Sequence, residues 1–357
     1  MSEPSSIVIR NIFHMLCYAF KVLHQQNYQM IAEEEFLHVQ DMLAAILARG
    51  ISQQVKQGLY RTYVSYNSEQ KTLQGKLNPY PTKQLQSMKK QLLNCTYDEL
   101  SADNEPNQIL KATCMSLLSS GEVETKQKKD LRKLMFYFGE ISDIDLSSVQ
   151  WNRMQFSRNS QSYVMLMNIC YMIRQSLLPS TDVGRRKLSM FDEESLPRLY
   201  EKFILEYYRQ HFPMLHASDK AIEWDIPEDT NPAEKRLLPG MHSDIFLSHR
   251  GHILIIDAKY YKHSMATYMD KQILHNANLY QIYTYVKNQD KMHNGNVSGM
   301  LLYAKTTETT PPYLNVCMGG NQIIVQALDL NRSFPEIAYG LDQIALKQFG
   351  ETLKRIA

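Results

Sequence analysis

The sequence predicts an α+β protein with two domains, and three observations support this prediction. The chain has 357 residues, of which 44% are hydrophobic and 21% are charged, which is enough apolar material for more than one core. Helical spacing of apolar residues dominates the first half, with one short stretch of β-like pattern. The second half runs in the order helix, three strands, helix, strand. We expect an N-terminal domain over residues 1–150 and a C-terminal domain over residues 151–357.

Four helices are predicted in the first half. Apolar residues recur at helical spacing over Ile9–Leu23 and again over Phe36–Leu47, which we expect to be two packed helices. Asn107–Leu118 is predicted to be a third helix, and Lys126–Lys133 is a charged helix entry that is more typical of a solvated surface than of a site.

A β-hairpin is predicted between these helices. Tyr60–Tyr66 and Thr72–Leu77 are short β-like runs, separated by the turn-forming residues 67–69. Every charge from Lys71 to Lys90 is positive, which is compatible with a solvated face or with a surface that contacts phosphate or a partner. This basic strip consists of Lys71, Lys76, Lys83, Lys89 and Lys90.

The domain boundary has two candidate positions. Ser180–Arg186 has the composition of a linker, and Asp143–Trp151 is the second candidate. We place the boundary near the second and treat the apolar stretch over residues 163–175 as a helix leading into the C-terminal domain.

The composition excludes several classes of protein. With 39 Lys+Arg against 37 Asp+Glu, the net charge is +2, so any contact with nucleic acid depends on local patches. The five cysteines include no C-x-x-C pair, which fits neither a disulfide framework nor a structural zinc site and is typical of a reducing cytoplasm. The longest apolar run, Tyr163–Ile173, is well short of the roughly 20 residues that span a bilayer, so we expect no membrane anchor.

The C-terminal half carries a regular succession of helices and strands. Helical periodicity and turn signals define each element, and Gly251 suits a tight turn between the second and third strands. The expected elements are a helix at Leu196–Phe212, strands at Ala221–Ile226, Asp244–Ser248 and Ile253–Lys259, a helix at Tyr268–Lys287, strands at Gly299–Ala304 and Gln322–Leu328, and a helix from Ala338.

The hairpin between the second and third strands brings three charged side chains together. If Arg250 and Gly251 form a two-residue loop, paired positions sum to 501, and Asp244 lies directly opposite Asp257. Lys259 is two residues beyond Asp257 and therefore points from the same face of the strand. The sequence thus predicts two carboxylates and an ammonium group at one place.

Such a pair of carboxylates is a candidate metal site. Two close carboxylates repel each other unless a cation lies between them, and Mg²⁺ prefers oxygen ligands. Lys259 could then orient or deprotonate an attacking water, or stabilise negative charge on phosphorus. A D-x-K triplet also occurs by chance as a plain salt bridge. The apolar approach Ile253–Ile256, Asp244 in register and Glu201 among apolar neighbours on the preceding helix favour a site.

These residues resemble the PD-(D/E)XK nuclease superfamily, in which the order αβββαβ holds the metal. The resemblance makes Asp244 the first acid, Asp257 and Lys259 the D-x-K pair, and Glu201 the acid on the helix that supports the metal. Ser243 stands where the superfamily has a proline, which shapes the loop and ligates nothing.

Two further features come with this resemblance. Gln281 and Tyr285 look like the Q-x-x-x-Y signature of RecB-type nucleases, in which these residues contact DNA or brace the site. The implied mechanism is Mg²⁺-assisted phosphodiester hydrolysis, with the Ala258 carbonyl as a further ligand. Without the resemblance, Gln281 and Tyr285 would be interpreted as a polar helix residue and a core tyrosine.

Several blocks outside the site are similar to a more specific family, the McrC endonuclease subunits of McrBC-type restriction systems. They are spread over most of the chain, and none carries chemistry of its own. These blocks are Ile7–Phe20, Thr72–Leu77, Cys95–Ser101, Asn107–Thr113 and Leu199–Tyr208.

The McrC resemblance implies a division of labour between this chain and a partner. McrC works with McrB, a hexameric AAA+ GTPase that recognises modified cytosine in double-stranded DNA and binds the GTP. The N-terminal domain of McrC docks into the McrB ring and stimulates GTP hydrolysis, while its C-terminal domain cuts. The absence of a G-x-x-x-x-G-K-[ST] motif agrees with this division. The predicted hairpin Tyr60–Leu77 and its basic strip are our candidates for the part that enters the ring.

Two other functions remain open at this point. The chain could be a non-catalytic activator of the AAA+ partner, although intact Asp244, Asp257 and Lys259 argue against that. It could also be a RecB-like nuclease that works alone.

Overall fold

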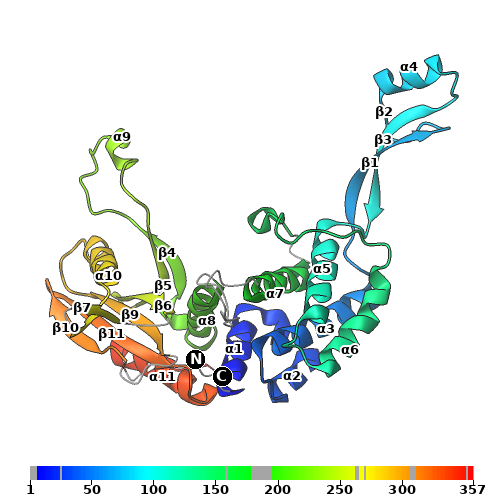
Figure 1. Cartoon of the computed structure of the whole chain (residues 1–357). Helices are drawn as coiled ribbons and strands as arrows, with labels where there is room; N and C mark the ends of the chain where they lie inside the picture. The colour runs from blue at the N-terminus through cyan, green and yellow to red at the C-terminus, as the bar shows by residue number, and fades with distance from the viewer. Residues whose placement is uncertain are drawn as a thin grey trace. The chain divides into compact units, whose positions relative to one another are not determined.

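The computed structural model describes residues 6–24, 26–156, 160–177, 195–261, 265–268, 271–305, 311–350 and 353–356. The chain forms two compact units, one made of Met1–Leu37 together with Leu188–Ala357, the other of His38–Lys187. Figure 1 shows the elements of both units.

This division differs from the expected boundary at residue 150. Helix α1 (Ser6–Ala19) packs on α8 (Ser195–His211), with the ring of Tyr18 5.3 Å from that of Phe203. The Nδ2 atom of Asn11 also donates to the carbonyls of Leu330 and Arg332 at 2.9 and 2.8 Å. The first helix therefore belongs with the C-terminal elements. The alternative boundary, at residues 180–186, lies outside the described residues.

The unit His38–Lys187 has a helical core. The predicted helices are present, but α7 does not lead into the C-terminal domain as expected, because it belongs to this unit. Helices α3 and α5 both pack on α6 and α7. Apolar residues at helical spacing fill the space between them, among them Leu43, Ile46 and Leu47, which are fully buried. The helices are α3 (Val39–Gln57), α5 (Glu105–Ser119), α6 (Thr125–Met135) and α7 (Gln161–Leu177).

An arm extends from these helices (Figure 1). We use this name for Thr62–Ser101, which comprises strands β1, β2 and β3 and helix α4. The strands form a three-stranded sheet in the order β1-β3-β2. The bounds are β1 (Thr62–Gln70), β2 (Lys76–Leu77), α4 (Pro79–Ser87) and β3 (Leu93–Ser101).

The predicted hairpin of Tyr60–Tyr66 with Thr72–Leu77 is wrong. Both runs pair with β3 instead, as in Tyr66 with Tyr97 and Leu77 with Cys95. Residues 67–69, expected to be a turn, lie inside β1. Nine consecutive pairs with β3 outweigh the weak turn preference of Asn and Ser at this point.

The other unit is built on a six-stranded sheet in the order β10-β11-β9-β6-β5-β4. Strands β6, β9 and β11 are parallel to one another, and the remaining pairs are antiparallel. The predicted order helix, three strands, helix, strand is present, and the α+β class is confirmed. The bounds are β4 (Ser218–Ile222), β5 (Met241–His249), β6 (His252–Lys259), α10 (Asn276–Gln289), β9 (Val297–Lys305), β10 (Leu314–Met318), β11 (Asn321–Asp329) and α11 (Phe334–Phe349).

Two predicted elements in this unit have different limits. The helix predicted from Tyr268 begins at Asn276, and before it β7 (Met265–Tyr268) pairs with β8 (Lys271–Leu274). Apolar periodicity alone cannot separate such short strands from a helix. The strand predicted to end at Ile226 ends at Ile222, because the indole N–H of Trp224 donates to the Pro239 carbonyl at 2.9 Å and the chain leaves the sheet.

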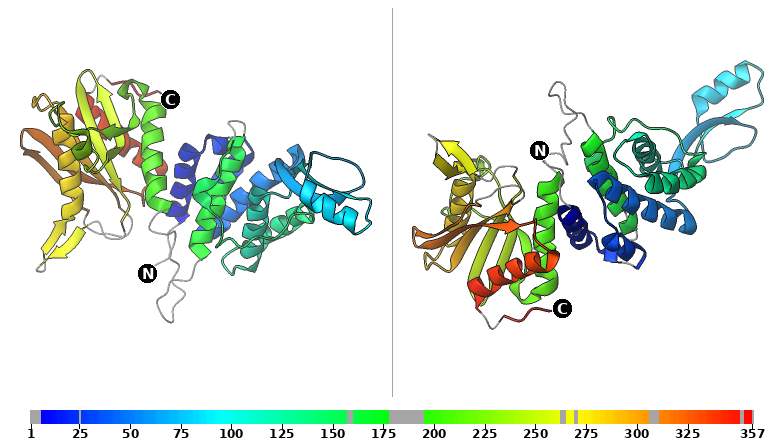
Figure 2. Two further views of the ribbon diagram at one scale, coloured as in Figure 1. Left: turned by 90° about the horizontal axis from the view of Figure 1, so that it is seen from above. Right: turned by 60° about the horizontal axis from the view of Figure 1, so that its bottom comes forward.

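Helices cover both faces of the six-stranded sheet (Figure 2). Ile282, Tyr285 and Val286 of α10 share one core cluster with Ile255 of β6. Leu254 and Ile256 point to the opposite face and are also fully buried, there by α8 and its neighbours. Within the described part of the chain, no helix combines the length and hydrophobicity needed to cross a membrane.

Candidate functional site

The predicted pairing of β5 with β6 is confirmed. Ile245 pairs with Ile256 and His249 with His252, so Arg250 and Gly251 form the two-residue loop. Both loop residues have positive φ, 49° and 83°, as a tight hairpin of this kind requires. The same register, continued by one position, places Asp244 opposite Asp257.

Asp244 is fixed by the backbone of the facing strand. Its Oδ2 atom accepts a hydrogen bond of 2.8 Å from the backbone N–H of Ala258. The N–H of Ala258 therefore orients Asp244, and the role of the Ala258 carbonyl as a metal ligand stays a prediction.

Asp257 and Lys259 form a buried ion pair. The Nζ atom of Lys259 lies 2.8 Å from Oδ2 of Asp257, and the two side chains are 17% and 1% exposed. Apart from this ammonium group, the Asp257 carboxylate has no hydrogen-bond donor of good geometry among the described residues. A buried carboxylate with so few donors is costly unless a cation or a proton compensates it.

The electrostatics agree with a site that needs a cation. Burial raises the pKa of Asp257, and the carboxylate of Asp244 raises it further against the effect of Lys259. Burial also raises the pKa of Asp244, with the carboxylate of Glu201 adding to the effect. Without a metal, the pair can hold a proton between its members. Burial by itself would lower the pKa of Lys259, but the two aspartates outweigh it and raise that pKa.

Glu201 lies near this pair on α8. Burial raises the pKa of Glu201, while Lys259 lowers it and Asp257 raises it, so all three groups lie within electrostatic reach of one another. Among the described residues, however, no group of three or more His, Cys, Asp or Glu side chains is arranged to hold a metal ion. The role of Glu201 in supporting a metal therefore stays a prediction.

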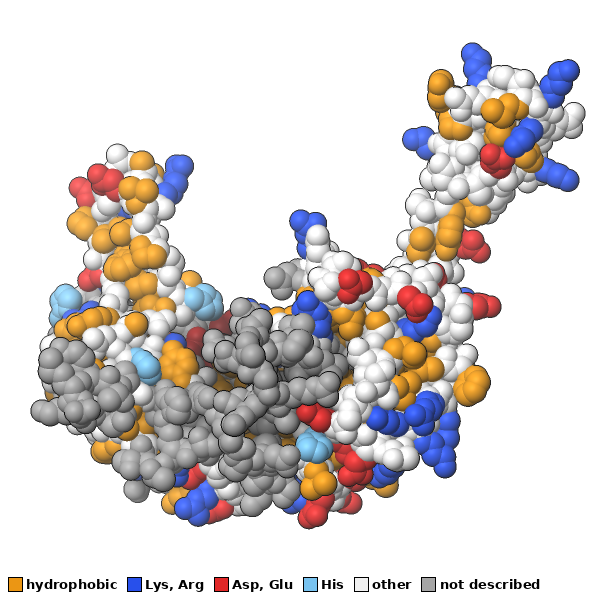
Figure 3. Space-filling model, in the orientation of Figure 1, with side chains coloured by type: hydrophobic (Ala, Val, Ile, Leu, Met, Phe, Trp, Pro, Cys, Tyr) orange, Lys and Arg blue, Asp and Glu red, His pale blue; other side chains and the backbone are white. Residues whose placement is uncertain are grey.

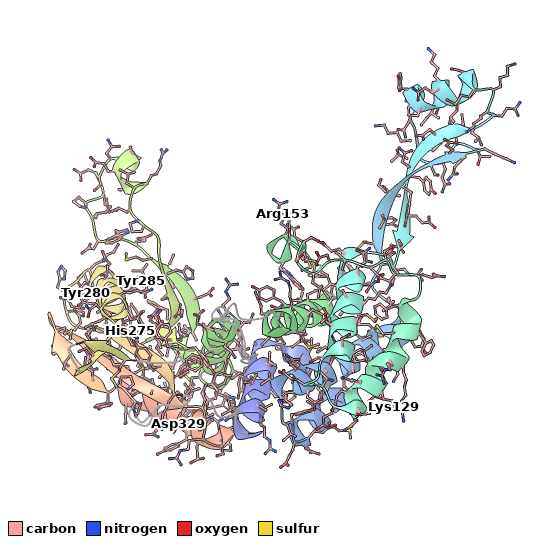
Figure 4. All side chains as sticks on the ribbon, viewed as in Figure 1. Lys129, Arg153, His275, Tyr280, Tyr285 and Asp329 are labelled. Atoms are coloured by element: carbon pink, nitrogen blue, oxygen red, sulfur yellow. The ribbon has the colours of Figure 1, made fainter. Side chains whose placement is uncertain are left out.

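Gln281 and Tyr285 join the site from α10. Oε1 of Gln281 accepts a long hydrogen bond of 3.4 Å from Nζ of Lys259, and its Nε2 donates to the Tyr285 hydroxyl at 3.0 Å. Tyr285, labelled in Figure 4, is 8% exposed and belongs to the core, whereas Tyr280 on the same helix is 67% exposed. Gln281 thus braces Lys259, and Tyr285 braces Gln281.

Sequence reasoning missed a second layer behind Lys259. The Nδ2 atom of Asn278 donates to the Tyr303 hydroxyl at 3.0 Å, and its Oδ1 accepts from Tyr261 at 3.3 Å. Tyr303 pairs with Lys259 across the parallel strands. The available signal was helical spacing, because Asn278 precedes Gln281 by three positions and shares its face of α10.

The donor set fits a magnesium ion. Asp244 and Asp257 supply two carboxylates at neighbouring positions, and among the described residues the Asp257 oxygens meet no donor other than Lys259. Mg²⁺ is usually held by one or two protein carboxylates and keeps several waters, so a third protein carboxylate is not needed.

The basic strip predicted from the sequence lies at the far end of the arm. Lys71, Lys76, Lys83, Lys89 and Lys90 are all exposed. Figure 3 shows Lys and Arg side chains gathered there, with few acidic ones. Large apolar side chains accompany them, since Leu73, Tyr80 and Met88 are 63%, 75% and 68% exposed. Exposed apolar side chains that are rimmed by polar ones are typical of an interaction surface.

Comparison with known proteins decides the family. Residues 5–304 match the family model described as McrBC 5-methylcytosine restriction system component. The chain belongs to this McrBC family. A relative from Escherichia coli (strain K12), the type IV methyl-directed restriction enzyme EcoKMcrBC, is 26% identical over 306 residues, which cover 84% of this chain and 87% of the relative. The family resemblance seen in the sequence is confirmed.

One of the McrBC structures that match this chain shares its fold. A chain of the half-complex from the tetradecameric assembly of Thermococcus gammatolerans McrB AAA+ hexamers with bound McrC matches with a TM-score of 0.51 and 17% identity, covering 95% of this chain and 76% of that one. A chain of the Thermococcus gammatolerans McrBC complex matches with a TM-score of 0.42 and 20% identity, over 57% of this chain and 58% of that one.

Proposed function

We propose that this chain is the DNA endonuclease subunit of a McrBC-type, 5-methylcytosine-dependent restriction system. Its unit built on the six-stranded sheet would be a PD-(D/E)XK nuclease domain that hydrolyses phosphodiester bonds with Mg²⁺. The observation that carries the proposal is the placement of Asp244, Asp257 and Lys259 at one point of a chain that belongs to the McrBC family.

In this proposal Asp244, Asp257 and the Ala258 carbonyl hold Mg²⁺, and Glu201 supports the ion through water. When bound, the ion supplies positive charge that polarises the phosphate under attack. The N–H of Ala258 keeps Asp244 in place. The ammonium group of Lys259, held by Asp257 and Gln281, donates hydrogen bonds to the attacking water or to the phosphate oxygens and stabilises the charge that develops there.

We further propose that the arm docks on a McrB-like AAA+ GTPase hexamer and stimulates its GTP hydrolysis. The support is the exposed arrangement of lysines, Leu73, Tyr80 and Met88 at the far end of the arm. One of the matching solved structures contains McrB AAA+ hexamers with bound McrC. GTP and the reader of modified cytosine would belong to the partner.

The test is plasmid cleavage by the purified chain with Mg²⁺, alone and with its AAA+ partner plus GTP, on methylated and unmethylated DNA. We expect cleavage of methylated plasmid only in the complete mixture. Robust cutting by the chain alone would instead indicate a stand-alone nuclease. Stimulated GTP hydrolysis without any cutting would indicate a non-catalytic activator.

A further inference from the structure

The root of the arm is the place where its direction is set. The chain enters the arm at Tyr60, just before β1, and leaves it at Ala102, just after β3, and neither residue is part of a helix or strand. Strand β3 packs mainly on β1, β2 and α4, the other elements of the arm. The contacts that fix the arm to the helices are therefore concentrated at Tyr60 and Ala102.

Asn107 of α5 ties both points together. This residue is fully buried. Its Nδ2 atom donates to the carbonyl of Tyr60 at 2.8 Å and to that of Ala102 at 2.7 Å. Its Oδ1 atom accepts from the Tyr163 hydroxyl at 2.7 Å. Both amide donors are thus used on the arm root, and one acceptor position is used by Tyr163 of α7.

Two neighbours complete the connection. Asn104, the N-cap residue of α5, donates through Nδ2 to the carbonyls of Tyr60 at 2.9 Å and Ser101 at 3.2 Å. The hydroxyl of Tyr163, from α7, accepts the backbone N–H of Tyr60 at 2.9 Å. Burial raises the pKa of Tyr163 to about 12, so the hydroxyl keeps the proton that it donates to Asn107.

These contacts connect the arm to the helices. Partly buried backbone groups outside regular structure need partners, and here side chains of α5 and α7 supply them at both ends of the arm. If one partner is lost, the arm root opens more easily while the helical core keeps its own apolar contacts.

We propose that Asn104, Asn107 and Tyr163 form an arm-root clamp, a set of positioning residues that holds the arm in the direction from which it engages its AAA+ partner. This inference rests on the docking proposed above. None of the three side chains needs to touch the partner. Their role is to keep most of the molecules in the binding-competent orientation, so that binding does not have to order the arm.

A loosened clamp has a distinct kinetic signature. If only a fraction of molecules holds the arm correctly, the apparent dissociation constant rises by the inverse of that fraction. Once the complex forms, the arm occupies its normal place, so the GTP hydrolysis rate at saturation is unchanged. Altered contact residues on the arm, in contrast, can change both quantities.

The test uses the full chain with Tyr163→Phe, which removes a single oxygen atom. Its matched control is Tyr171→Phe on the same helix, whose hydroxyl accepts a local bond of 2.9 Å from Gln175. In Tyr163→Phe we expect faster hydrogen exchange at the Tyr60 amide and unchanged exchange in the helices. Half-maximal stimulation of the partner's GTP hydrolysis should need about tenfold more of the chain, while the maximal rate is unchanged. The control should behave as the unmodified chain.

A second variant guards against a general loss of folding. Asn104→Ser keeps an N-cap oxygen for α5 but removes both amide donors to the arm root, and it should give the same shift. The clamp proposal would be overturned if both variants showed faster hydrogen exchange at Tyr60 but needed no more of the chain for half-maximal stimulation. If replacement of the exposed arm lysines also left stimulation unchanged, the docking proposal itself would fail.

Discussion

At the scale of single residues, Lys259 has the most specific role. Its ammonium group contacts Asp257 and Gln281, and in the proposed mechanism it compensates charge that develops on a phosphate. Lys259→Gln should lower the rate of DNA cleavage about 10²- to 10³-fold, the usual effect of removing such a donor. The measurement is cleavage of methylated plasmid in the complete mixture.

The matched control for that variant is Lys287→Gln. Lys287 also binds through its ammonium group, to the Gly319 carbonyl and Asn321 Oδ1, both at 2.9 Å, but it comes late in α10. Its loss should leave the cleavage rate within about twofold once folding is verified. Equal loss of activity in both variants would contradict a specific role for Lys259.

Asp290 provides a prediction on pH and stability. Burial by itself would raise the pKa of this carboxyl, but hydrogen bonds from Asn321, Gly295 and Asn294 outweigh burial and lower the pKa in the folded chain. Its contribution to the free energy of unfolding is therefore complete above its ordinary pKa of about 3.9 and is lost as the pH falls through the lower folded value.

Thermal unfolding from pH 7 to pH 3 checks this prediction with Asp290→Asn. The variant should have a lower melting temperature than the unmodified chain at neutral pH. This difference in melting temperature should become smaller below about pH 4. A difference in melting temperature that stays constant from pH 7 to pH 3 would show that the charge of Asp290 does not contribute to stability.

Residue spacing is sufficient to predict the main contacts of the site. Period-two alternation together with the Arg250-Gly251 loop brings Asp244, Asp257 and Lys259 to one place, and the observed register agrees. Helical spacing places Asn278 on the same face of α10 as Gln281, but it does not predict that Asn278 contacts Tyr303. Their hydrogen bond joins α10 to β9, and no local pattern shows which polar residue of a helix meets a given strand.

At the scale of elements, the contact of α10 with β9 holds Gln281 and Tyr285 over the site. A Cβ atom added to Gly299 of β9 would lie 2.7 Å from Val286 and 2.8 Å from Ile282, so the helix lies directly against this glycine. Gly299→Val should displace α10, destabilise the unit by about 1–3 kcal/mol and lower cleavage as well.

The check is thermal unfolding together with cleavage measured well below the melting temperature. Gly121→Val is a suitable control, since nothing lies within 4 Å of its added Cβ atom. Full cleavage by folded Gly299→Val would show that the position of α10 does not matter to the site.

Elements whose pairing partners are close in the sequence were predictable. Elements that pair with distant segments were not. The β5–β6 hairpin was predictable because Gly251 favours a tight turn between neighbouring strands, and the positive φ of Arg250 and Gly251 agrees with this. In the arm, β1 instead pairs with β3, whose first residue Leu93 lies beyond α4 in the chain. The turn-like residues 67–69 could not reveal that partner, because it lies outside any local window.

At the scale of the whole chain, the two compact units do not follow sequence order. The N-terminal helix α1 belongs with the six-stranded sheet because Asn11 and Tyr18 meet residues more than 180 positions away. Apolar periodicity predicts that such a helix is buried, but it does not say against which part of the chain.

The arm carries the whole-molecule prediction. The triple variant Lys83→Glu, Lys89→Glu and Lys90→Glu should lower stimulation of the partner's GTP hydrolysis at least tenfold, and the deficit should shrink with added salt because exposed charges are screened. Lys347→Glu on α11, also exposed, is the control. Normal stimulation by the triple variant would contradict docking through the arm tip.

The central claim is that cutting and stimulation belong to different parts of one chain. Asp257→Ala in the complete mixture with Mg²⁺, the AAA+ partner and GTP tests it most directly, with cleavage and GTP hydrolysis measured in the same samples. We predict that cleavage of methylated plasmid is abolished while stimulation of GTP hydrolysis is unchanged. Cleavage at the normal rate, or loss of both activities in a folded variant, would contradict the account.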